Sequence, residues 1–554
     1  MSEPSGLSGL MQGHGLLISS LLRHAARHHA DTEIVSRRAD GGLDRRSWAG
    51  IEARARRLAA AFRALGVAEG ERIATLAWND WRHLEVYYAA PGMGAVCHTV
   101  NPRLHPSDIA YILNDAADKV LCIDPGFLPL LGAIAAELPT SLTDIVLLDD
   151  TLPATLPALP AHLRLHAHEA LIDAAAGDFV WPVLDERAAS ALCYTSGTTG
   201  RPKGVLYSHR STVLHAFGIN MADAMGFRAV DRVMPVVPMF HVNAWGIPYA
   251  AAMAGAALIL PGRQLDGASL HALMNAEQVS MSAGVPTVWL NLLAHLRSTG
   301  GRLDTVQRIM TGGTACTSLL IDAFADEYGV RMEHAWGMSE ISPVGTYHAL
   351  KPAQSALPEA ERRRHLLKQG RVLALLDMKI VDGEGRELPW DGVQFGDLKL
   401  RGPWVTAAYF GQAPGSALDA DGWFATGDVA TIDADGFMEI TDRSKDVIKS
   451  GGEWISSIAL ENIAQSHPDV AEAAVIAARH PKWDERPLLL VVPRPGRTPT
   501  EAGLLDAFTG KVPKWWLPDA VLIVGELPHT ATGKLQKTAL RARYADHLLA
   551  LKTD

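Results

Sequence analysis

The sequence predicts an α/β protein with a large N-terminal domain and a small C-terminal domain. A chain of 554 residues exceeds what one hydrophobic core normally supports, so two or more domains are expected. Short apolar runs alternate with helical patterns over residues 72–311, which indicates parallel strands in wound α/β subdomains. Short strands between glycine turns follow residue 370, and a unit that mixes helices and strands begins at residue 442. The predicted fold is therefore wound α/β subdomains with a small β-rich region, followed by a small α+β domain.

The N-terminal domain, residues 1–441, is predicted from alternating elements. Its helices carry apolar residues at helical spacing, at residues 16–29, 48–65, 81–88, 106–114, 270–277 and 288–296. Its α/β strands are short apolar runs, at residues 72–77, 120–123, 144–148, 205–208, 232–238, 256–260 and 308–311. The β-rich region adds strands at residues 378–381, 398–401 and 437–441. The proline-rich segment 151–160 is expected on the surface.

The C-terminal domain, residues 442–554, is predicted as a compact unit of about 110 residues. Its predicted helices lie at residues 457–465 and 500–508. Its predicted strands lie at residues 470–477, 488–493 and 520–524. We therefore place the domain boundary between residues 441 and 442.

Composition indicates a globular protein that acts on small molecules. The chain is 48% hydrophobic and 20% charged, a profile typical of folded soluble domains. Its formal charge of −10 argues against nucleic acid as the main partner. The longest apolar run, residues 247–260, is short of the ~20 residues that span a bilayer, and the first 20 residues lack the pattern of a secretory signal. We therefore expect a cytoplasmic protein with no transmembrane segment.

The four cysteines are far apart in the chain, which fits neither a disulfide framework nor a zinc site. They are Cys97, Cys122, Cys193 and Cys316. Because their neighbours are apolar or small, we expect them to be buried as small hydrophobic residues.

Residues 195–204 form a loop with the composition of a phosphate-binding site. They supply four hydroxyls, three glycines and two cations. Glycines allow close backbone approach to a ligand, and N–H groups and hydroxyls can surround phosphate oxygens. The loop differs from a Walker A motif because Gly204 follows Lys203 and because Pro202 removes an amide. A mobile loop between two strands, closing over a triphosphate, is favoured over a flexible surface linker, since both cations lie among the glycines.

Three later motifs suit a nucleotide, although each has a plainer interpretation. Paired glycines at residues 312–313 admit a flat ligand such as adenine, or form an ordinary turn. In residues 334–340, Trp336 is able to stack a base and Glu340 to hold magnesium, or the two are a buried aromatic beside a helix start. Asp428, after Thr-Gly at a predicted turn, suits two ribose hydroxyls, or makes an Asx turn.

Two further segments suggest a moving joint and a mobile cation. Residues 442–454 are dense in charge and lie at the predicted domain boundary, as a hinge would, although a charge run is usually a solvated face. Lys534 follows a small flexible turn and would reach a carboxylate or phosphate of the other domain; the plainer interpretation is a surface lysine.

The order of these motifs resembles the adenylate-forming superfamily of acyl-CoA synthetases, adenylation domains and luciferases. The resemblance runs from about residue 47 to the C-terminus. Within the superfamily, residues 237–245 and 451–457 look most like medium- or long-chain fatty acyl-CoA ligases, and methylthiopropionate-CoA ligases look similar there.

The resemblance implies a role for each matching position. ATP phosphates would bind at Thr195, Ser196, Gly197, Thr198, Thr199, Gly200 and Lys203. Mg²⁺ would lie at Thr195 and Glu340, ribose at Asp428, and adenine among Gly313, His334, Ala335 and Trp336. Further nucleotide or coenzyme A contacts would come from Val242, Ser339, Arg443, Lys445, Lys449 and Trp454. His241 would border the acyl carboxylate, Trp245 would gate an apolar tunnel, Asp442 would be the hinge, and Lys534 would stabilise charge during adenylation.

Three positions depart from the commonest family pattern. Trp336 stands where tyrosine is frequent and Ser339 where threonine is frequent, so the ring and the hydroxyl are kept. His529 stands where arginine is frequent, which removes a fixed charge.

The resemblance implies a ligase that activates a medium- to long-chain fatty acid as acyl-AMP and transfers it to coenzyme A. Its partners would be the acid, ATP and coenzyme A, with no nucleic acid, and related ligases are often homodimers. Alternatives are a short acid such as methylthiopropionate, an aryl acid, or delivery to a carrier protein. A catalytically silent nucleotide-binding protein is disfavoured because Lys534, Glu340 and Asp428 are all present.

Overall fold

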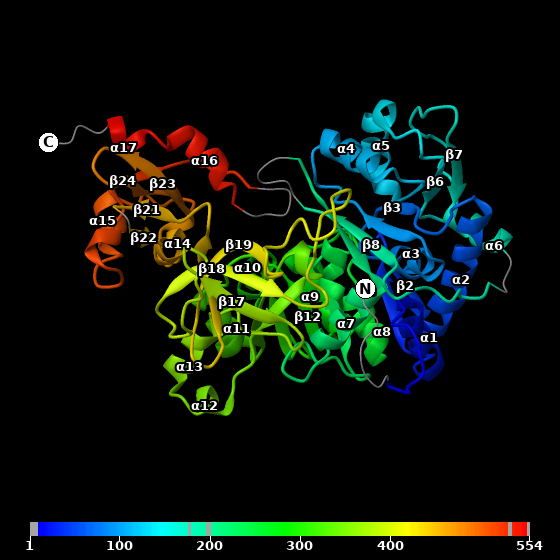
Figure 1. Ribbon diagram of the computed structural model, residues 1–554, viewed down its shortest axis with the longest axis horizontal. Coiled ribbons are helices and arrows are strands. Elements are labelled where there is room, and N and C mark those ends of the chain that lie inside the picture. Colours follow the sequence, from blue (N-terminus) through cyan, green and yellow to red (C-terminus); the bar gives the residue numbers. More distant parts are fainter. Residues whose placement is uncertain (1–8, 176–178, 196–200, 452, 530–534, 551–554) are drawn as a thin grey trace.

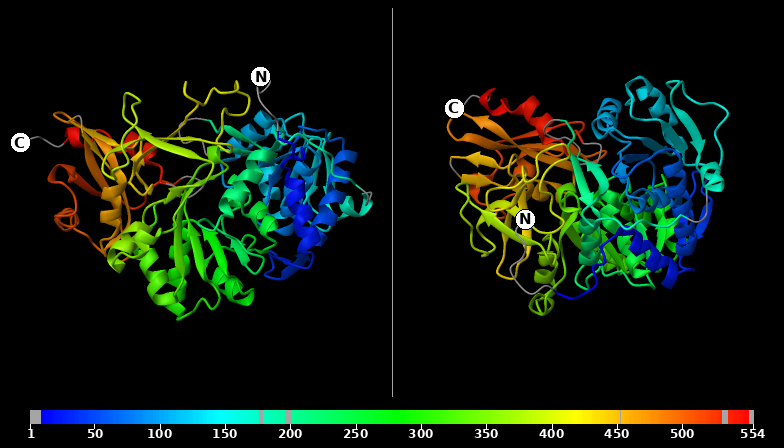
Figure 2. Two further views of the ribbon diagram at one scale, coloured as in Figure 1. Left: turned by 60° about the horizontal axis from the view of Figure 1, so that its bottom comes forward. Right: turned by 45° about the vertical axis from the view of Figure 1, so that its right-hand side comes forward.

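The computed structural model describes residues 9–175, 179–195, 201–451, 453–529 and 535–550, and it contains four β-sheets (Figure 1). Two large sheets with their helices form most of the molecule, and a four-stranded sheet and a five-stranded sheet follow along the chain. The C-terminal unit lies at one end of the molecule and the seven-stranded sheet at the other, as both views of Figure 2 show. The mixed α/β fold predicted from the sequence is confirmed.

A seven-stranded sheet carries the phosphate-loop motif at its edge. Its order is β7-β6-β5-β3-β4-β8-β9, and all neighbours are parallel except β8 and β9. The strands are β3 (Arg72–Leu76), β4 (Val96–Thr99), β5 (Val120–Ile123), β6 (Asp144–Leu147), β7 (Arg164–Ala167), β8 (Ala189–Tyr194) and β9 (Gly204–Ser208). The apolar runs over β3, β5 and β6 are buried, as parallel strands covered on both faces require.

A nine-stranded sheet provides the remaining nucleotide motifs. Its order is β16-β15-β14-β13-β12-β10-β11-β1-β2, with antiparallel pairs only at its two edges. The strands are β1 (Glu33–Arg37), β2 (Leu43–Ser47), β10 (Arg232–Pro235), β11 (Ala257–Leu260), β12 (Met281–Gly284), β13 (Arg308–Thr311), β14 (Arg331–Gly337), β15 (Val344–Tyr347) and β16 (Arg371–Val372). The predicted strand 232–238 is shorter than expected, since β10 ends at Pro235.

Helices of the N-terminal part begin at recognisable caps. Ser47 accepts from the amide of Gly50 before α2, Asp80 accepts from His83 before α3, and Ser208 forms a capping box with Ser211 before α7. The helices are α1 (Ile18–His28), α2 (Trp48–Ala64), α3 (Trp81–Gly92), α4 (Pro106–Ala116), α5 (Leu128–Ile134), α6 (His168–Ala174), α7 (His209–Ile219), α8 (Ile247–Ala254), α9 (Gly267–Ala276), α10 (Pro286–Thr299), α11 (Ser318–Tyr328), α12 (Pro352–Ser355) and α13 (Glu359–Leu366).

The last two sheets follow the β-rich and α+β predictions. An antiparallel sheet contains β17 (Asp377–Val381), β18 (Phe395–Arg401), β19 (Phe424–Ile432) and β20 (Met438–Arg443). The C-terminal sheet contains β21 (Ile448–Ser450), β22 (Glu453–Ile455), β23 (Val470–His480), β24 (Asp484–Pro493) and β25 (Ala520–Ile523). Its helices are α14 (Ser457–Gln465), α15 (Glu501–Asp506), α16 (Lys537–Tyr544) and α17 (His547–Ala550). This unit has its own core, in which Leu460, Val475 and Phe508 are fully buried.

The apolar segment 247–260 and the cysteines are buried, as predicted. The segment forms α8 and β11, and all four cysteines are buried and unpaired. Within the part of the chain that the structure describes, no helix has both the length and the apolar character needed to cross a membrane.

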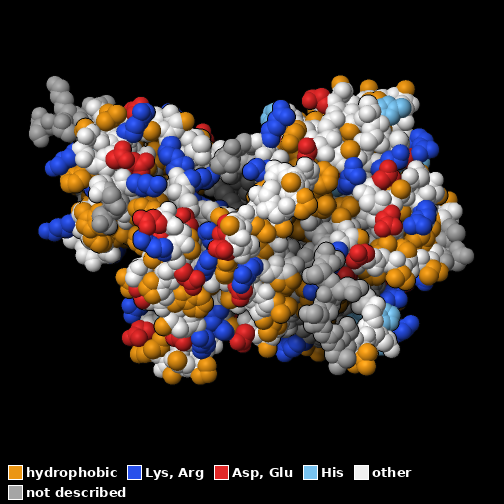
Figure 3. All heavy atoms as spheres, in the orientation of Figure 1, with side chains coloured by type: hydrophobic (Ala, Val, Ile, Leu, Met, Phe, Trp, Pro, Cys, Tyr) orange, Lys and Arg blue, Asp and Glu red, His pale blue; other side chains and the backbone are white. Residues whose placement is uncertain are grey.

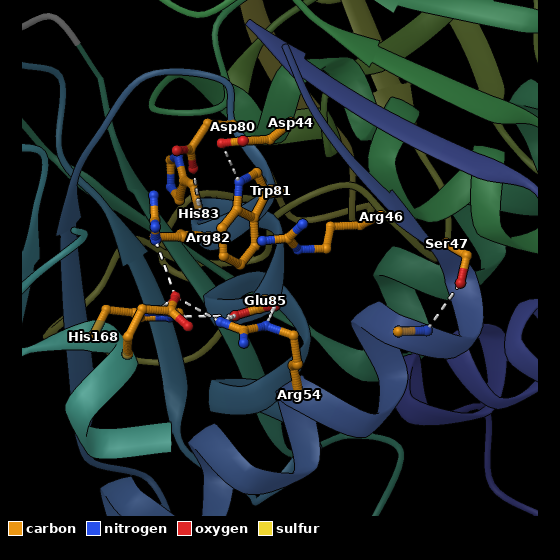
Figure 4. A network of polar contacts seen from close by, with 12 residues as sticks. Asp44, Arg46, Ser47, Arg54, Asp80, Trp81, Arg82, His83, Glu85 and His168 are labelled. Carbon is orange, nitrogen blue, oxygen red and sulfur yellow. Dashed lines mark hydrogen bonds and ion pairs between the residues drawn. The ribbon is translucent and has the colours of Figure 1, made fainter. Parts of the chain in front are cut away.

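A polar network joins α2, α3 and α6 (Figure 4). Arg54 of α2 places Nε 2.5 Å from Oε1 of Glu85 on α3 and Nη2 2.7 Å from Oε1 of Glu169 on α6. Burial raises the pKa of the enclosed Glu85 carboxyl to about 8, although Arg54 opposes this shift. The Arg54 guanidinium also lies 4.7 Å from the ring centroid of Trp81. One arginine therefore holds three helices together.

Arg54→Met is expected to lower the free energy of unfolding by about 3–5 kcal/mol, because Glu85 then stays buried without its cation. Arg56→Met on the same helix is the matched control. Arg56 pairs with Glu52 at a partly exposed i,i+4 position, so a loss below about 1 kcal/mol is expected. Urea unfolding measures both variants, and equal losses would contradict the role of Arg54.

Candidate active site

The two ends of the phosphate-loop motif are held together by strands β8 and β9. The pairing of Tyr194 with Gly204 closes the antiparallel ladder, and the next residues extend it. The amide of Thr195 donates to the carbonyl of Lys203 at 2.9 Å, and the amide of Lys203 donates to Oγ1 of Thr195 at 3.3 Å. The predicted strand on each side of the loop is confirmed. The remaining predicted phosphate contacts lie outside the described residues: Ser196, Gly197, Thr198, Thr199 and Gly200.

Tyr409 connects this loop to Glu340. Glu340 is only 7% exposed, and its Oε1 accepts a hydrogen bond of 2.9 Å from the Tyr409 hydroxyl. The ammonium of Lys203 lies 4.9 Å from the centroid of the Tyr409 ring, within the range of a cation–π contact. The amide of Phe410 donates to the carbonyl of Gly204 at 2.8 Å, which fixes Tyr409 beside the loop. The loop cation and the buried carboxylate therefore share one aromatic residue that no motif in the sequence had identified.

Ser339 and Glu340 follow the end of β14 in a short 3₁₀ helix (Ser339–Ile341). Both are buried, and the Tyr207 hydroxyl donates to the carbonyl of Ser339 at 2.6 Å. Tyr207 lies on β9, so the two large sheets meet at the base of the phosphate loop. In the surface view the molecule is hollowed between the C-terminal unit and the seven-stranded sheet (Figure 3).

Asp428 is held by two donors from distant segments. It is 2% exposed; Oδ2 accepts from Nε1 of Trp336 at 2.9 Å, and Oδ1 lies 2.8 Å from Nε of Arg443. The structure thus brings together two residues predicted for adenine and ribose, and it adds a direct bond between them. Trp336 orients the carboxylate, in addition to any contact with a base.

The predicted turn at Asp428 is wrong. Residues 426–428 lie inside strand β19, where they stand opposite Leu398 between the pairs Asp397–Val429 and Lys399–Ala425. Gly427 has a φ of +74°, which a glycine adopts without strain. The Thr-Gly-Asp sequence therefore marks a bulge, and bulges direct side chains out of the ladder.

The glycine pair lies against the next strand, as a site for a flat ligand requires. A Cβ at Gly312 would lie 2.6 Å from the carbonyl oxygen of Ala335, and Gly313 has a φ of +82°. His334 is buried, which lowers its pKa to about 4, and its Nδ1 donates to the carbonyl of Leu367 at 3.0 Å. The predicted adenine residues Gly313, His334 and Ala335 are therefore neighbours, with the imidazole neutral.

Trp245 lies beside the glycine pair, on a turn whose backbone is left-handed. The short helix that contains it (Val242–Gly246) has positive φ angles of 42, 51, 47 and 58° from Val242 to Trp245. Such angles cost roughly 1–2 kcal/mol per residue for non-glycine residues. A Cβ on Gly312 would lie 3.5 Å from Cη2 of Trp245, so the indole ring lies beside the glycine pair. His241 is half-buried immediately before this turn.

The predicted hinge is buried between two units. Asp442 is 1% exposed and accepts from the amides of Arg443 at 2.7 Å and Ser457 at 2.5 Å. The ring of Trp454 in the C-terminal unit lies 5.8 Å from that of Phe395 on β18. Burial lowers the pKa of Lys445, and the ammonium of Lys449 lies 5.9 Å from the Trp454 ring centroid.

The structure describes only one of two C-terminal residues to which the sequence drew attention. Lys534 lies outside the described residues. His529 faces a carboxylate, with Nε2 3.7 Å from Oε2 of Glu472 on β23.

Two family models and several curated relatives match this chain over most of its length. Residues 22–410 match the family model of AMP-binding enzymes, and residues 459–534 match that of the AMP-binding enzyme C-terminal domain. A 3-methylmercaptopropionyl-CoA ligase of Ruegeria lacuscaerulensis is 53% identical over 98% of this chain and 99% of its own. A medium-chain fatty acid–CoA ligase of Ectopseudomonas oleovorans is 50% identical, covering 98% of both chains. A long-chain fatty acid–CoA ligase of Thermus thermophilus is 47% identical, covering 97% of both chains.

Solved structures share the same fold. The anthranilate CoA ligase AuaEII in complex with anthranoyl-AMP superposes with a TM-score of 0.82 at 24% identity, over 95% of this chain and 97% of that one. ATP-bound MatB from Rhodopseudomonas palustris superposes with a TM-score of 0.79 at 25% identity, over 96% and 99%.

Proposed function

The chain belongs to the AMP-binding enzyme family and is an ATP-dependent acyl-CoA ligase, and from this premise we propose that its acid is a linear aliphatic acid of about the size of 3-methylmercaptopropionate. The position of Trp245 carries this proposal. Its ring lies beside Gly312, where the acyl group would leave the nucleotide site. A short acid would need only the space in front of this ring, whereas a long chain would need the ring to move. The two curated relatives at 53% and 51% identity that act on this acid support the same choice.

A medium-chain fatty acid is the second candidate. The relative that acts on such acids is 50% identical, only slightly less similar than the first two. The left-handed turn that carries Trp245 also favours it, because a rearrangement of this turn would release backbone strain. This candidate keeps the gating role predicted for Trp245 and requires the open position of its ring.

We assign the adenylation step to residues around the loop. The acid's carboxylate would attack the α-phosphate of ATP, and charge stabilisation and positioning dominate such phosphoryl chemistry. Lys203 would contribute a cation beside the phosphates, and His241 would border the carboxylate of the acid. Asp428, oriented by Trp336 and Arg443, would accept from the ribose hydroxyls. Coenzyme A would then displace AMP from the acyl-adenylate.

The residue types at the loop base fit Mg²⁺. The ion prefers oxygen donors and commonly binds one or two carboxylates together with substrate phosphates. Thr195 and Glu340 offer a hydroxyl and a buried carboxylate, and Tyr409 orients one oxygen of that carboxylate. These two residues would hold an ion that neutralises charge on the ATP phosphates.

The remaining expectations are part of the same proposal. We place a mobile C-terminal domain at residues 442–554, moving about Asp442 and carrying Lys534, with an N-terminal domain of residues 1–441. We also propose a homodimer in the cytoplasm, which light scattering during size-exclusion chromatography and fractionation of the source cells would test. A monomer at micromolar concentration would contradict the dimer.

Trp245→Ala is expected to shift the acid preference toward longer chains. Removing the indole opens the volume beside Gly312, so kcat/KM for octanoate should rise about tenfold relative to that for 3-methylmercaptopropionate. AMP release with a panel from propionate to palmitate, with ATP and coenzyme A saturating, measures this shift.

The control for this variant is Trp390→Ala, which removes a 39% exposed indole from a loop between β17 and β18. It should leave the chain-length profile unchanged. An unchanged profile in Trp245→Ala would remove Trp245 as the determinant. A wild-type preference for octanoate over 3-methylmercaptopropionate would replace the first candidate acid with the second.

A further inference from the structure

The hinge residue Asp442 has its backbone in one unit and its side chain in the other. Its backbone pairs with Val429 in the antiparallel sheet of the N-terminal part. Its carboxylate accepts from the amide of Ser457, the first residue of α14 in the C-terminal unit. The adjacent Ser456 hydroxyl donates to the carbonyl of Thr441. The N-terminus of α14 therefore contacts the hinge segment through two consecutive residues, Ser456 and Ser457. The N-terminal end of a helix favours a negative charge such as the Asp442 carboxylate.

Lys537 lies behind this contact. The ammonium of Lys537 is 2.7 Å from Oε1 of Glu461 and donates to Oγ of Ser457 at 2.5 Å. Lys537 is 9% exposed, Glu461 is 8% exposed and Ser457 is fully buried. Ser457 thus contacts both the hinge carboxylate, through its amide, and the lysine, through its hydroxyl.

The charges around Lys537 make it the cation of a buried acidic cluster. Burial raises the pKa of Asp442 and of Glu461, so each carboxylate depends on a nearby positive charge to stay ionised. Burial alone would lower the pKa of Lys537, but Glu461 and Asp442 raise it above its usual value. Asp446 adds to this effect.

Helix α16 contacts the hinge segment a second time, one turn later. Arg541, four residues after Lys537, places Nη1 2.6 Å from Oδ1 of Asp446 and 2.9 Å from the carbonyl oxygen of Lys445. Residues four apart lie on one face of a helix. One face of α16 therefore binds both the hinge carboxylate cluster and the residues just after the hinge.

We propose that Lys537 is a positioning residue for the ligase reaction, acting through Ser457 and Glu461 to fix the Asp442 side chain to the C-terminal unit. With the side chain fixed, rotation is confined to the backbone of the hinge. The C-terminal unit then presents defined orientations to the N-terminal site. The inference rests on the proposed rotation about Asp442, and it goes beyond it by naming the group that determines where the chain turns.

The test compares Lys537→Met, Lys537→Arg and the surface control Lys511→Met in the full-length ligase. Each half-reaction is measured separately, as pyrophosphate exchange and as thioester formation from supplied acyl-AMP. Lys537→Met is expected to lower kcat about tenfold in both, because both need a placed C-terminal unit. KM for ATP and for the acid should stay within about twofold, since the residues proposed to hold adenine, ribose, the ATP phosphates and the acid's carboxylate lie before residue 442, apart from Arg443, Lys445, Lys449 and Trp454, none of which is changed. Lys537→Arg should recover most of the lost rate, and Lys511→Met should match the wild type.

A purely structural role gives a different result. It predicts a lower fraction of folded protein, with normal kcat per active site after titration of ATP-binding sites. That result, or an unchanged kcat in folded Lys537→Met, would overturn the proposal. If Lys537→Met does not fold, Ser457→Ala removes the hydroxyl contact and keeps the amide bond to Asp442; an unchanged kcat in that variant would also overturn it. All rates use the acid with the highest wild-type kcat/KM, so an error in the proposed acid does not affect the outcome.

Discussion

Glu340→Gln is expected to slow acyl-adenylate formation by roughly 10²–10³-fold, the range seen when one preorganised electrostatic contact to a reacting centre is lost. Glutamine keeps the volume of the side chain, and its amide oxygen still accepts from Tyr409, so the fold around the site is preserved. What disappears is the negative charge that would hold Mg²⁺ against the ATP phosphates. Pyrophosphate exchange measured over a range of Mg²⁺ concentrations should show both a lower rate and a higher Mg²⁺ requirement.

The same strand region offers a matched control for Glu340→Gln. Glu333 on β14 is also 7% exposed and also accepts from a tyrosine hydroxyl, that of Tyr347. Glu333→Gln is expected to change the exchange rate by less than about threefold, because the Glu333 carboxylate pairs with Arg308 and Arg331 and has no proposed contact with the nucleotide. Equal losses in the two variants would show that Glu340 acts through stability alone.

Lys534→Ala is expected to abolish adenylation while largely sparing thioester formation from supplied acyl-AMP. A cation directed at the charge that develops during attack on the α-phosphate is worth roughly 10²–10³ in rate. The second half-reaction starts from the adenylate and does not need it. Pyrophosphate exchange and thioester formation on one preparation separate the two effects.

Lys511→Ala controls for the loss of a lysine from the same unit and should leave both half-reactions unchanged. Normal pyrophosphate exchange in Lys534→Ala would contradict the role of Lys534 in adenylation. A parallel loss in both half-reactions would instead assign this lysine to domain placement.

Elements with continuous apolar or helical patterns were predictable from the sequence, whereas strands with polar residues were not. Strands β3, β5 and β13 match their apolar runs. Strand β4 escaped prediction because it includes His98, which is fully buried against Asp118 with Nδ1 2.9 Å from Oδ2. A buried hydrogen bond to a carboxylate satisfies such a residue, but its partner is 20 positions away in the chain. The polar edge strand β2 likewise has no apolar run.

The candidate site was predictable as a set of motifs, but its internal contacts were not. Each motif contains the residue type that its chemistry needs. The bond between Trp336 and Asp428 joins residues 92 positions apart, and that between Tyr409 and Glu340 joins residues 69 apart. No local pattern reports such pairs, because they depend on how β14, β19 and the segment after β18 are brought together. Tyr409 was missed for this reason.

The ladder between β19 and β20 has a thermodynamic consequence. Asp428 pairs in register with Arg443, and the preceding residue Asp442, the proposed hinge, pairs with Val429. The Arg443 guanidinium also lies 2.8 Å from the Asp428 carboxylate. A rotation that moves Arg443 changes the charge that a bound ribose meets, so nucleotide affinity and domain angle are linked functions. Whatever factor the proposed rotation would apply to AMP affinity, AMP would apply to the rotation equilibrium, and the motion proposed to admit coenzyme A would then also bias release of the product.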